Sequence, residues 1–114
     1  MNIAINGFGR IGRLFLRQVF GAPDMSVVAI NDIGDVENLA YLLQYDSVYG
    51  RWRCEVSQDP KRRSFLIDGK AIAFVGEREI AKLPWKQLSV DIVIEATGLF
   101  ESFAEARAHI TAGA

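Results

Sequence analysis

The feature that most constrains the fold is a short apolar run that leads through a glycine-rich turn directly into a helical pattern. Residues 3–5 (Ile-Ala-Ile) form the run, and the turn is Gly7-Phe8-Gly9-Arg10-Ile11-Gly12. Beyond the turn, apolar residues recur at helical spacing until Gly21-Ala22-Pro23, where a glycine followed by a proline ends the helix. A strand, a G-x-G-x-x-G turn and a helix in this order predict a βαβ unit with a diphosphate site at the start of its helix.

Strands and helices continue to alternate further along the chain. A second apolar run, residues 27–30, ends at Asn31-Asp32, and Asp35 then has the position of an N-cap for a helix. A third run, residues 92–94, is expected to be a buried strand. Near-continuous apolar strands that alternate with helices are typical of parallel sheets covered on both faces. We therefore predict an α/β fold of the Rossmann type, with a doubly wound, mostly parallel sheet.

The middle of the chain departs from this alternation. Apolar strands on either side of Asp68-Gly69 predict a hairpin, an antiparallel excursion from the parallel sheet. We expect residues 51–63 to form an exposed strand and loop. Apolar residues recur at helical spacing near Pro84, which predicts a helix there. A last helix is expected from Ser102 onward. Because the chain stops where another strand would follow, residues 1–114 are expected to form one domain that lacks its last strands.

The three glycines of the turn have separable roles. Gly7 permits a tight turn, Gly9 lets the backbone approach a diphosphate, and Gly12 lets the helix pack close to the sheet. Two cations, Arg10 and Arg13, oppose the dipole of the helix by about 0.3–1 kcal/mol each, and a bound diphosphate would reverse that sign. The alternative is a purely structural strand–helix turn with solvated arginines.

Asp32 gives the turn an acidic partner. It follows Gly12 by 20 positions, the spacing expected of a carboxylate that accepts hydrogen bonds from an adenosine ribose. A 2′-phosphate, which NADP carries and NAD lacks, would meet a like charge there at a cost of about 1–4 kcal/mol per charge pair. No arginine or lysine at positions 33–36 offsets this repulsion. Asp32 therefore favours NAD, unless it is simply a solvated residue at the end of a strand.

Composition narrows the classes of protein further. The chain has 114 residues, of which 50% are hydrophobic and 24% charged, and its net charge is −1. This balance fits a soluble globular domain and lacks the basic excess of a nucleic-acid-binding protein. No apolar run approaches the roughly 18 residues that span a membrane, and the N-terminus lacks the basic start of a secretory signal. We therefore expect a cytoplasmic protein without nucleic-acid or membrane partners.

Cysteine and histidine are too scarce for several common kinds of site. Cys54 is the single cysteine, so the chain cannot form an internal disulfide. Together with His109, the single histidine, it cannot supply the four ligands of a structural zinc site. The basic residues around Trp52 are interleaved with acids, which indicates a solvated hairpin more than a nucleic-acid surface. The sequence therefore predicts no metal site.

Longer stretches of the sequence are more specific than the glycine pattern. The first is Ile5-Asn6-Gly7-Phe8-Gly9-Arg10-Ile11-Gly12-Arg13. Five more follow in order: Ala29-Ile30-Asn31-Asp32, residues 42–51 (LLQYDSVYGR), Leu83-Pro84-Trp85, residues 90–98 (VDIVIEATG) and residues 108–114 (AHITAGA). Through these stretches, essentially over its whole length, the chain resembles the amino-terminal, NAD-binding part of phosphorylating glyceraldehyde-3-phosphate dehydrogenase.

The resemblance implies a Rossmann domain that binds NAD and is followed, in the family, by a catalytic domain. The family oxidises glyceraldehyde 3-phosphate with inorganic phosphate: a cysteine thiolate attacks the aldehyde, a histidine acts as base, and hydride passes to NAD. Its members are homotetramers, which implies a homo-oligomer here. By position, the implied cofactor-binding residues are Gly7, Gly9 and the backbone of Arg10 and Ile11 at the pyrophosphate, Asn31 and Asp32 at the adenosine ribose, Arg78 beside the adenine, and Thr97 and Gly98 toward the nicotinamide.

The chain departs from the family pattern in details and in one larger respect. Tyr49 stands where histidine is common, Ala96 where serine is usual, and Ile33 where leucine is common. None of the three removes a phosphate or ribose contact. The family's catalytic cysteine and histidine lie beyond position 114, so we expect no catalytic residue here, structural roles for Cys54 and His109, and no activity of the chain alone.

Two alternatives remain open at this point. Erythrose-4-phosphate dehydrogenase is similar in this half, although it tends to carry glutamate where this chain has Asp32. The other alternative is a non-catalytic fragment that binds NAD or only oligomerises.

Overall fold

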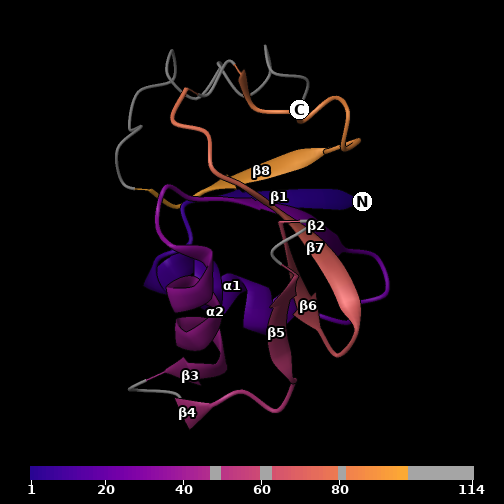
Figure 1. The fold of residues 1–114 in the computed structure, drawn as a ribbon. Coiled ribbons are helices and arrows are strands. Elements are labelled where there is room, and N and C mark those ends of the chain that lie inside the picture. The colour runs from indigo at the N-terminus through magenta and orange to yellow at the C-terminus, as the bar shows by residue number, and fades with distance from the viewer. Residues whose placement is uncertain (47–49, 60–62, 80–81, 98–114) are drawn as a thin grey trace.

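The computed structural model describes residues 1–46, 50–59, 63–79 and 82–97. Its helices and strands are β1 (Asn2–Asn6), α1 (Arg10–Val19), β2 (Ser26–Asn31), α2 (Val36–Gln44), β3 (Tyr45–Asp46), β4 (Gly50–Arg51), β5 (Val56–Asp59), β6 (Ser64–Ile67), β7 (Lys70–Val75) and β8 (Ile92–Glu95). Within these residues six strands form one sheet in the order β5-β6-β7-β2-β1-β8, and β3 pairs with β4 (Figure 1).

The pairing within the sheet confirms the predicted fold class. β1 pairs in parallel with β2 and with β8, and β2 pairs in parallel with β7. β6 is antiparallel to both β5 and β7. The hairpin turn between β6 and β7 lies at Asp68 and Gly69, with φ of +48° and +84°, which are the two positive φ values of a type I′ turn. The fold is therefore α/β and Rossmann-like, with the antiparallel excursion where the sequence predicts it.

Helix α1 ends next to the glycine predicted to stop it, and helix α2 begins at its predicted N-cap residue. After α1 the Phe20 N–H donates to the Leu16 carbonyl, and Gly21 follows with φ +87°. At the start of α2 the Asp35 carboxylate accepts a hydrogen bond from the Asn38 N–H at 3.1 Å. A cap of this second kind stabilises a helix by about 1 kcal/mol.

Both helices cover the same face of the sheet (Figure 1). Large apolar side chains from the helices and strands form one core there, among them the fully buried Ile5, Leu16, Ile30 and Leu43. Arg17 joins the two helices, since its guanidinium donates to the Leu43 carbonyl at the end of α2 at 2.6 Å. The strands and both helices therefore share a single core on this side.

The opposite face of the sheet carries small side chains and a tryptophan. Ala4, Ala29 and Ala73 are register neighbours across β1, β2 and β7, and we call them the alanine row. Trp85 is completely buried in a second core cluster that includes Ala4 and Ala29. Because the alanine side chains are small, they leave the volume that the indole ring fills.

The segment that closes this second face corrects one expectation. Within the described residues it is irregular, so the helix expected near Pro84 is wrong. The two described helices both lie on the other face, and the helix expected from Ser102 lies outside the described residues. The Leu88 N–H donates to the Pro84 carbonyl and the Val90 N–H to the Trp85 carbonyl, which are single turns of chain. Apolar side chains spaced three or four apart pack a compact loop as well as a helix, and this similarity explains the error.

Two expectations about exposure are also wrong. Trp52 and Cys54, in the segment predicted to be exposed, are buried. The side-chain amide of Gln44 donates to both of their carbonyl groups, and Phe20 packs edge-on against the Trp52 ring. Ile92 is 40% exposed because β8 is the last strand of the sheet in the described part of the chain.

Several predictions concern residues outside the described ranges. They are the helix from Ser102 onward, the family departure at Tyr49, the binding residue Gly98, and His109. Among the residues that are described, no helix is long and apolar enough to cross a membrane. The same residues contain no group of three or more side chains that could hold a metal ion.

Candidate functional site

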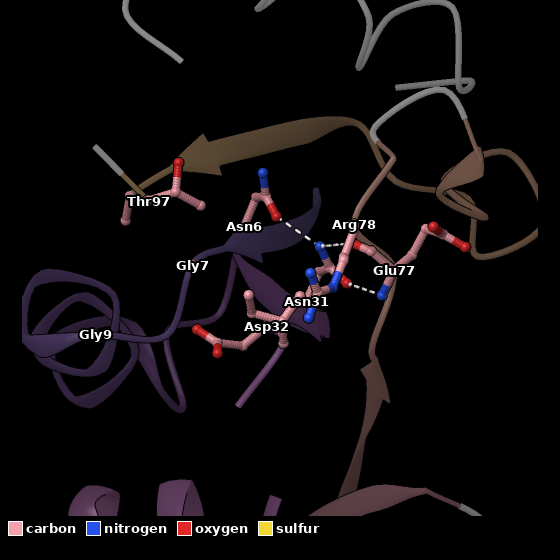
Figure 2. A pocket seen from close by; sticks show the side chains of 10 residues that line it. Asn6, Gly7, Gly9, Asn31, Asp32, Glu77, Arg78 and Thr97 are labelled. Carbon is pink, nitrogen blue, oxygen red and sulfur yellow. Dashed lines mark hydrogen bonds between the residues drawn. The ribbon is translucent and has the colours of Figure 1, made fainter. Parts of the chain in front are cut away.

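A cavity of about 470 Å³ opens at the carboxyl ends of the parallel strands (Figure 2). Its lining comes from the ends of β1 and β2 and from the residues after β7 and β8: Asn6, Gly7, Gly9, Asn31, Asp32, Ile33, Glu77, Arg78, Ala96 and Thr97. β2 lies on one side of β1 and the much later β8 on the other, so the strand order reverses at β1. Open α/β sheets bind ligands at such a reversal, outside the carboxyl ends of the strands.

The glycine-rich turn forms one wall of this cavity. Gly7 has φ +95°, and its N–H donates to the Asn31 carbonyl at 2.8 Å. A Cβ at Gly7 would lie 2.6 Å from the Thr97 nitrogen, so no other residue fits there without a shift of the backbone. Phe8 is fully buried, and the centroid of its ring lies 5.5 Å from that of Phe65 in the core. The turn is thus fixed by a tight fit at Gly7 and by a buried anchor at Phe8.

The start of α1 is open on the side that faces away from the sheet. A Cβ at Gly12 would collide with the Gly7 carbonyl oxygen, which confirms the close approach predicted for that glycine. A Cβ at Gly9, in contrast, would meet no described atom within 4 Å. No described side chain caps the helix, and no acid lies in its first turn. Since the first amides of a helix have no partner within it and carry a positive partial charge, a diphosphate fits this opening.

The Asp32 carboxylate is held in place by two backbone amides. Its Oδ2 accepts a hydrogen bond from the Phe8 N–H at 2.7 Å, and its Oδ1 accepts one from the Gly34 N–H at 2.7 Å. Each carboxylate oxygen has lone pairs for a further hydrogen bond, so a ligand hydroxyl can still bind. Asp32 is therefore a fixed, half-buried acceptor at the cavity wall and not a freely solvated side chain.

Asn31 connects the end of β2 to two other parts of the cavity wall. Its Nδ2 donates to the Asn6 Oδ1 at 2.7 Å and to the Glu77 carbonyl at 3.0 Å, while its Oδ1 accepts from the Glu77 N–H at 2.9 Å (Figure 2). Both asparagines are buried, with exposed fractions of 3% for Asn6 and 5% for Asn31. These bonds hold the loop that carries Arg78 against β2.

The cavity brings together six of the predicted cofactor-binding residues: Gly7, Gly9, Asn31, Asp32, Arg78 and Thr97. Figure 2 shows Arg78 and Thr97 on opposite sides of Asn6. Arg10 and Ile11 follow Gly9 in the first turn of α1 and are not among the lining residues; the Ile11 side chain is 71% exposed. Their predicted contribution comes from backbone amides, which this placement allows.

Arg13 has a different role from the one that its place in the motif predicts. Its Nη1 donates to the Phe8 carbonyl at 3.0 Å. Burial lowers the pKa of its guanidinium, and the neighbouring charge of Asp46 opposes that effect. With Arg10 it lines a hollow separate from the cavity described above. Arg13 is therefore half-buried and supports the glycine-rich turn through its hydrogen bond to Phe8.

Three polar residues of this region are not among those that the sequence predicts. Asn6 and Glu77 line the cavity, and Glu95 accepts a hydrogen bond from the Asn6 side chain at 2.8 Å. Asn6 and Glu95 are the last residues of β1 and β8, and Glu77 lies two positions after β7. A polar residue at the carboxyl end of a predicted parallel strand is the signal that could have identified them.

Comparison with known proteins decides between the families that share this geometry. Residues 1–103 match the family described as "Glyceraldehyde 3-phosphate dehydrogenase, NAD binding domain". The chain belongs to this family. Glyceraldehyde-3-phosphate dehydrogenases of Thermotoga maritima and Haemophilus influenzae are each 48% identical to it over 114 residues, and that of Clostridium pasteurianum is 46% identical over 112 residues.

These alignments cover 98–100% of this NAD-binding domain but only 33–34% of the relatives. The chain therefore spans about a third of the length of the curated relatives it matches. Their names all refer to glyceraldehyde 3-phosphate, so the erythrose alternative is not favoured.

NAD is the cofactor of this domain family. The described lining residues include no cysteine, histidine or lysine. Cys54 lies in the core of the helix-covered face, away from the lining. Ile33 and Ala96, two departures from the family pattern, both line the cavity without adding a charge to it.

Proposed function

We propose that residues 1–114 form one NAD-binding domain, and that NAD occupies the cavity at the carboxyl ends of the parallel strands. The observation that carries this proposal is that a fixed acceptor, Asp32, and an open helix start, after Gly9, face the same cavity. A carboxylate and a set of free amides recognise the two chemically distinct parts of an adenosine diphosphate.

The two halves of NAD take different positions in this proposal. The adenosine lies at the end of β2, where Asp32 accepts hydrogen bonds from the ribose hydroxyls and Asn31 supports it. Arg78, at the edge of the cavity beyond Asn31, lies beside the adenine. The pyrophosphate lies on the backbone amides of Arg10 and Ile11, next to Gly7 and Gly9.

The nicotinamide half then extends toward β8. Asp32 is at β2 and the glycine-rich turn follows β1, so the remaining half continues across the sheet to the next strand in the order. Thr97, which follows β8, lines that path. The family resemblance implies a contact of Gly98 with the same half of NAD.

Calorimetric titration of this chain with NAD and with NADP tests the proposal. We expect one NAD per chain and weaker binding of NADP, because the 2′-phosphate would approach the Asp32 carboxylate at a cost of about 1–4 kcal/mol per charge pair. Equal affinities for the two dinucleotides, or no binding of either, would reject the assigned site.

We propose further that the domain serves an NAD-dependent dehydrogenase that oxidises glyceraldehyde 3-phosphate with inorganic phosphate. The chain alone is expected to be inactive, because Cys54 is its single cysteine and is buried, and burial raises the pKa of its thiol. An assay of NADH formation from glyceraldehyde 3-phosphate, NAD and phosphate measures this directly. Turnover by the chain alone would contradict the structural role assigned to Cys54.

The assembly and location of the protein complete the proposal. We propose a cytoplasmic homo-oligomer, a tetramer as in the family. An exposed aromatic pair supports an association surface: Tyr41 and Tyr45 are 62% and 44% exposed, and their ring centroids lie 5.0 Å apart. Sedimentation of this chain at increasing concentration measures whether copies associate.

A further inference from the structure

A continuous network of hydrogen-bonded side chains crosses the cavity, and we call it the polar network. It runs from the Glu77 backbone through Asn31 and Asn6 to Glu95, and from Glu95 to Thr97. The polar network joins the ends of β2, β1 and β8, which lie side by side in the sheet. It therefore connects the side of the cavity that carries Asp32 with the side that carries Thr97.

Glu95 supplies the hydrogen-bond acceptors at one end of the polar network. Its Oε2 accepts from the Asn6 Nδ2 at 2.8 Å, while its Oε1 accepts from the Thr97 hydroxyl at 2.6 Å and from the Thr97 N–H at 3.1 Å. An ionised carboxylate can only accept hydrogen bonds, so the Asn6 amide must turn its nitrogen toward Glu95. The Asn6 oxygen then faces Asn31, whose nitrogen donates to it.

At its Thr97 end, the polar network lies against the glycine-rich turn. A Cβ at Gly7 would come within 2.6 Å of the Thr97 nitrogen and 2.7 Å of its Cγ2. Two bonds from one carboxylate oxygen fix both the backbone and the side chain of Thr97 at this contact. The position of Thr97 therefore depends on Glu95, although Glu95 is not itself among the lining residues.

We propose that Glu95 is a positioning residue that holds Thr97 in the place needed for the nicotinamide half of NAD. This inference rests on the proposed function, because the order of the two halves in the cavity comes from it. Glu95 does not contact the adenosine half in this arrangement. Its loss should therefore weaken binding of the whole dinucleotide while sparing a ligand that fills only the adenosine side.

The substitution Glu95→Gln tests this with little change of shape. A glutamine at this place has one oxygen and one NH₂ group, so in either orientation a donor faces the Asn6 NH₂ or the Thr97 N–H. Because such a mismatch disorders one of the two contacts, we expect the Kd for NAD to rise about 10-fold and the Kd for AMP to change by less than about two-fold. Glu55→Gln, an exposed residue away from the cavity, is the matched control for the loss of one negative charge.

A second variant guards against a general effect on folding. Thr97→Val removes only the hydroxyl that donates to Glu95, and we expect it to raise the Kd for NAD about three-fold without affecting AMP. In the double variant the two effects should not add, because both act on the same contact between the side chain at position 95 and Thr97. Circular dichroism and thermal unfolding of each variant report whether the fold is kept.

The outcomes separate this inference from the proposed function. Equal weakening of NAD and AMP by Glu95→Gln, no change in either, or additive effects in the double variant would overturn the positioning role while the NAD site stands. If the unsubstituted chain binds neither NAD nor AMP, the proposed function fails and this inference fails with it.

Discussion

At the scale of single residues, the cavity depends on acceptors that are fixed before a ligand arrives. Both oxygens of Asp32 are bound to backbone amides of the surrounding loops, and Asn31 is bound on both sides. Groups fixed in this way lose little conformational freedom when a ligand binds, which favours affinity and selectivity.

Replacing Asp32 by alanine tests its role in cofactor selection. Without the carboxylate, NAD loses its ribose acceptor and NADP no longer meets a like charge. We expect NAD to bind more weakly and the preference for NAD over NADP to shrink about five-fold or more, corresponding to at least about 1 kcal/mol. Calorimetry with both dinucleotides measures the ratio of their Kd values on the same variant. The substitution also removes the acceptor of the Phe8 and Gly34 N–H groups, and the effect of this loss on both Kd values cancels in the ratio. An unchanged ratio would contradict the assignment.

Cys54 gives a prediction about pH at the same scale. Burial, together with a hydrogen bond to Asp68, raises the pKa of the thiol from its ordinary value of 9.0. A raised pKa in the folded state means that the thiol contributes stability below its unfolded pKa, and that this contribution is lost as the pH rises through the folded value. The free energy of unfolding should therefore fall more steeply above about pH 9 in the natural chain than in Cys54→Ala.

Urea unfolding of both chains at about pH 7 and about pH 10 measures that difference. All other ionisable groups are common to the two chains, so their contributions to the pH dependence cancel in the comparison. Parallel loss of stability in the two chains would show that Cys54 titrates as it does in the unfolded state.

The sequence predicted only some of these residues, for a reason that the contacts make clear. Asn31 and Asp32 follow a strand at a known spacing from the glycine motif, so a local pattern identifies them. Asn6 and Glu95 are 89 positions apart, and their contact exists only because β8 pairs with β1. A local sequence window shows that each of them ends a strand, but not that the two strands are neighbours in the sheet.

At the scale of secondary structure, the glycine-rich turn is the element whose geometry the sequence predicts most completely. Gly7, Gly9 and Gly12 each have a separate surrounding: a positive φ with a tight contact, open space, and a close backbone approach. The helix expected near Pro84 failed because its apolar spacing reports which side chains are buried and not which backbone bonds form.

Alanine substitutions at Gly7 and Gly9 should affect different properties, the first mainly stability and the second mainly NAD binding. Gly7→Ala places a Cβ against the Thr97 backbone and forces a positive φ on alanine, so we expect a loss of at least about 1–2 kcal/mol of stability. Gly9→Ala has open space around its Cβ and should cost less than about 1 kcal/mol. It should nevertheless weaken NAD, because the added methyl group stands where the diphosphate approaches.

Thermal unfolding and NAD titration of the two variants check both parts of this prediction. Normal NAD affinity of Gly9→Ala would show that the diphosphate does not approach the turn at that position. Normal stability of Gly7→Ala would show that the turn can relax away from Thr97.

At the scale of the whole molecule, the sheet has two unlike faces and an accessible edge. Both helices cover one face, and a loop with a buried tryptophan covers the alanine row on the other. In the described part of the chain β8 pairs with β1 on one side and with no strand on the other. The alternation of strands and helices predicted the sheet, whereas the packing of Trp85 on the alanine row in the described residues was not predicted.

The edge at β8 predicts self-association of the chain. A strand edge that no other described strand covers, with the apolar Ile92 at 40% exposure, is a template for pairing with a second copy. We expect light scattering to show a mass that rises with concentration, and Ile92→Lys to reduce that rise. A mass independent of concentration in the natural chain would mean that this edge is protected in solution.

The two core clusters also give the molecule a pair of separate optical reporters. Its only two tryptophans are divided between them, with Trp52 on the helix side of the sheet and Trp85 on the alanine row. Trp85 has no contact with solvent and should emit at short wavelength until its loop detaches. Replacing either tryptophan by phenylalanine would leave a single fluorescent tryptophan. The shift in its emission wavelength would then report the loosening of its own side of the sheet.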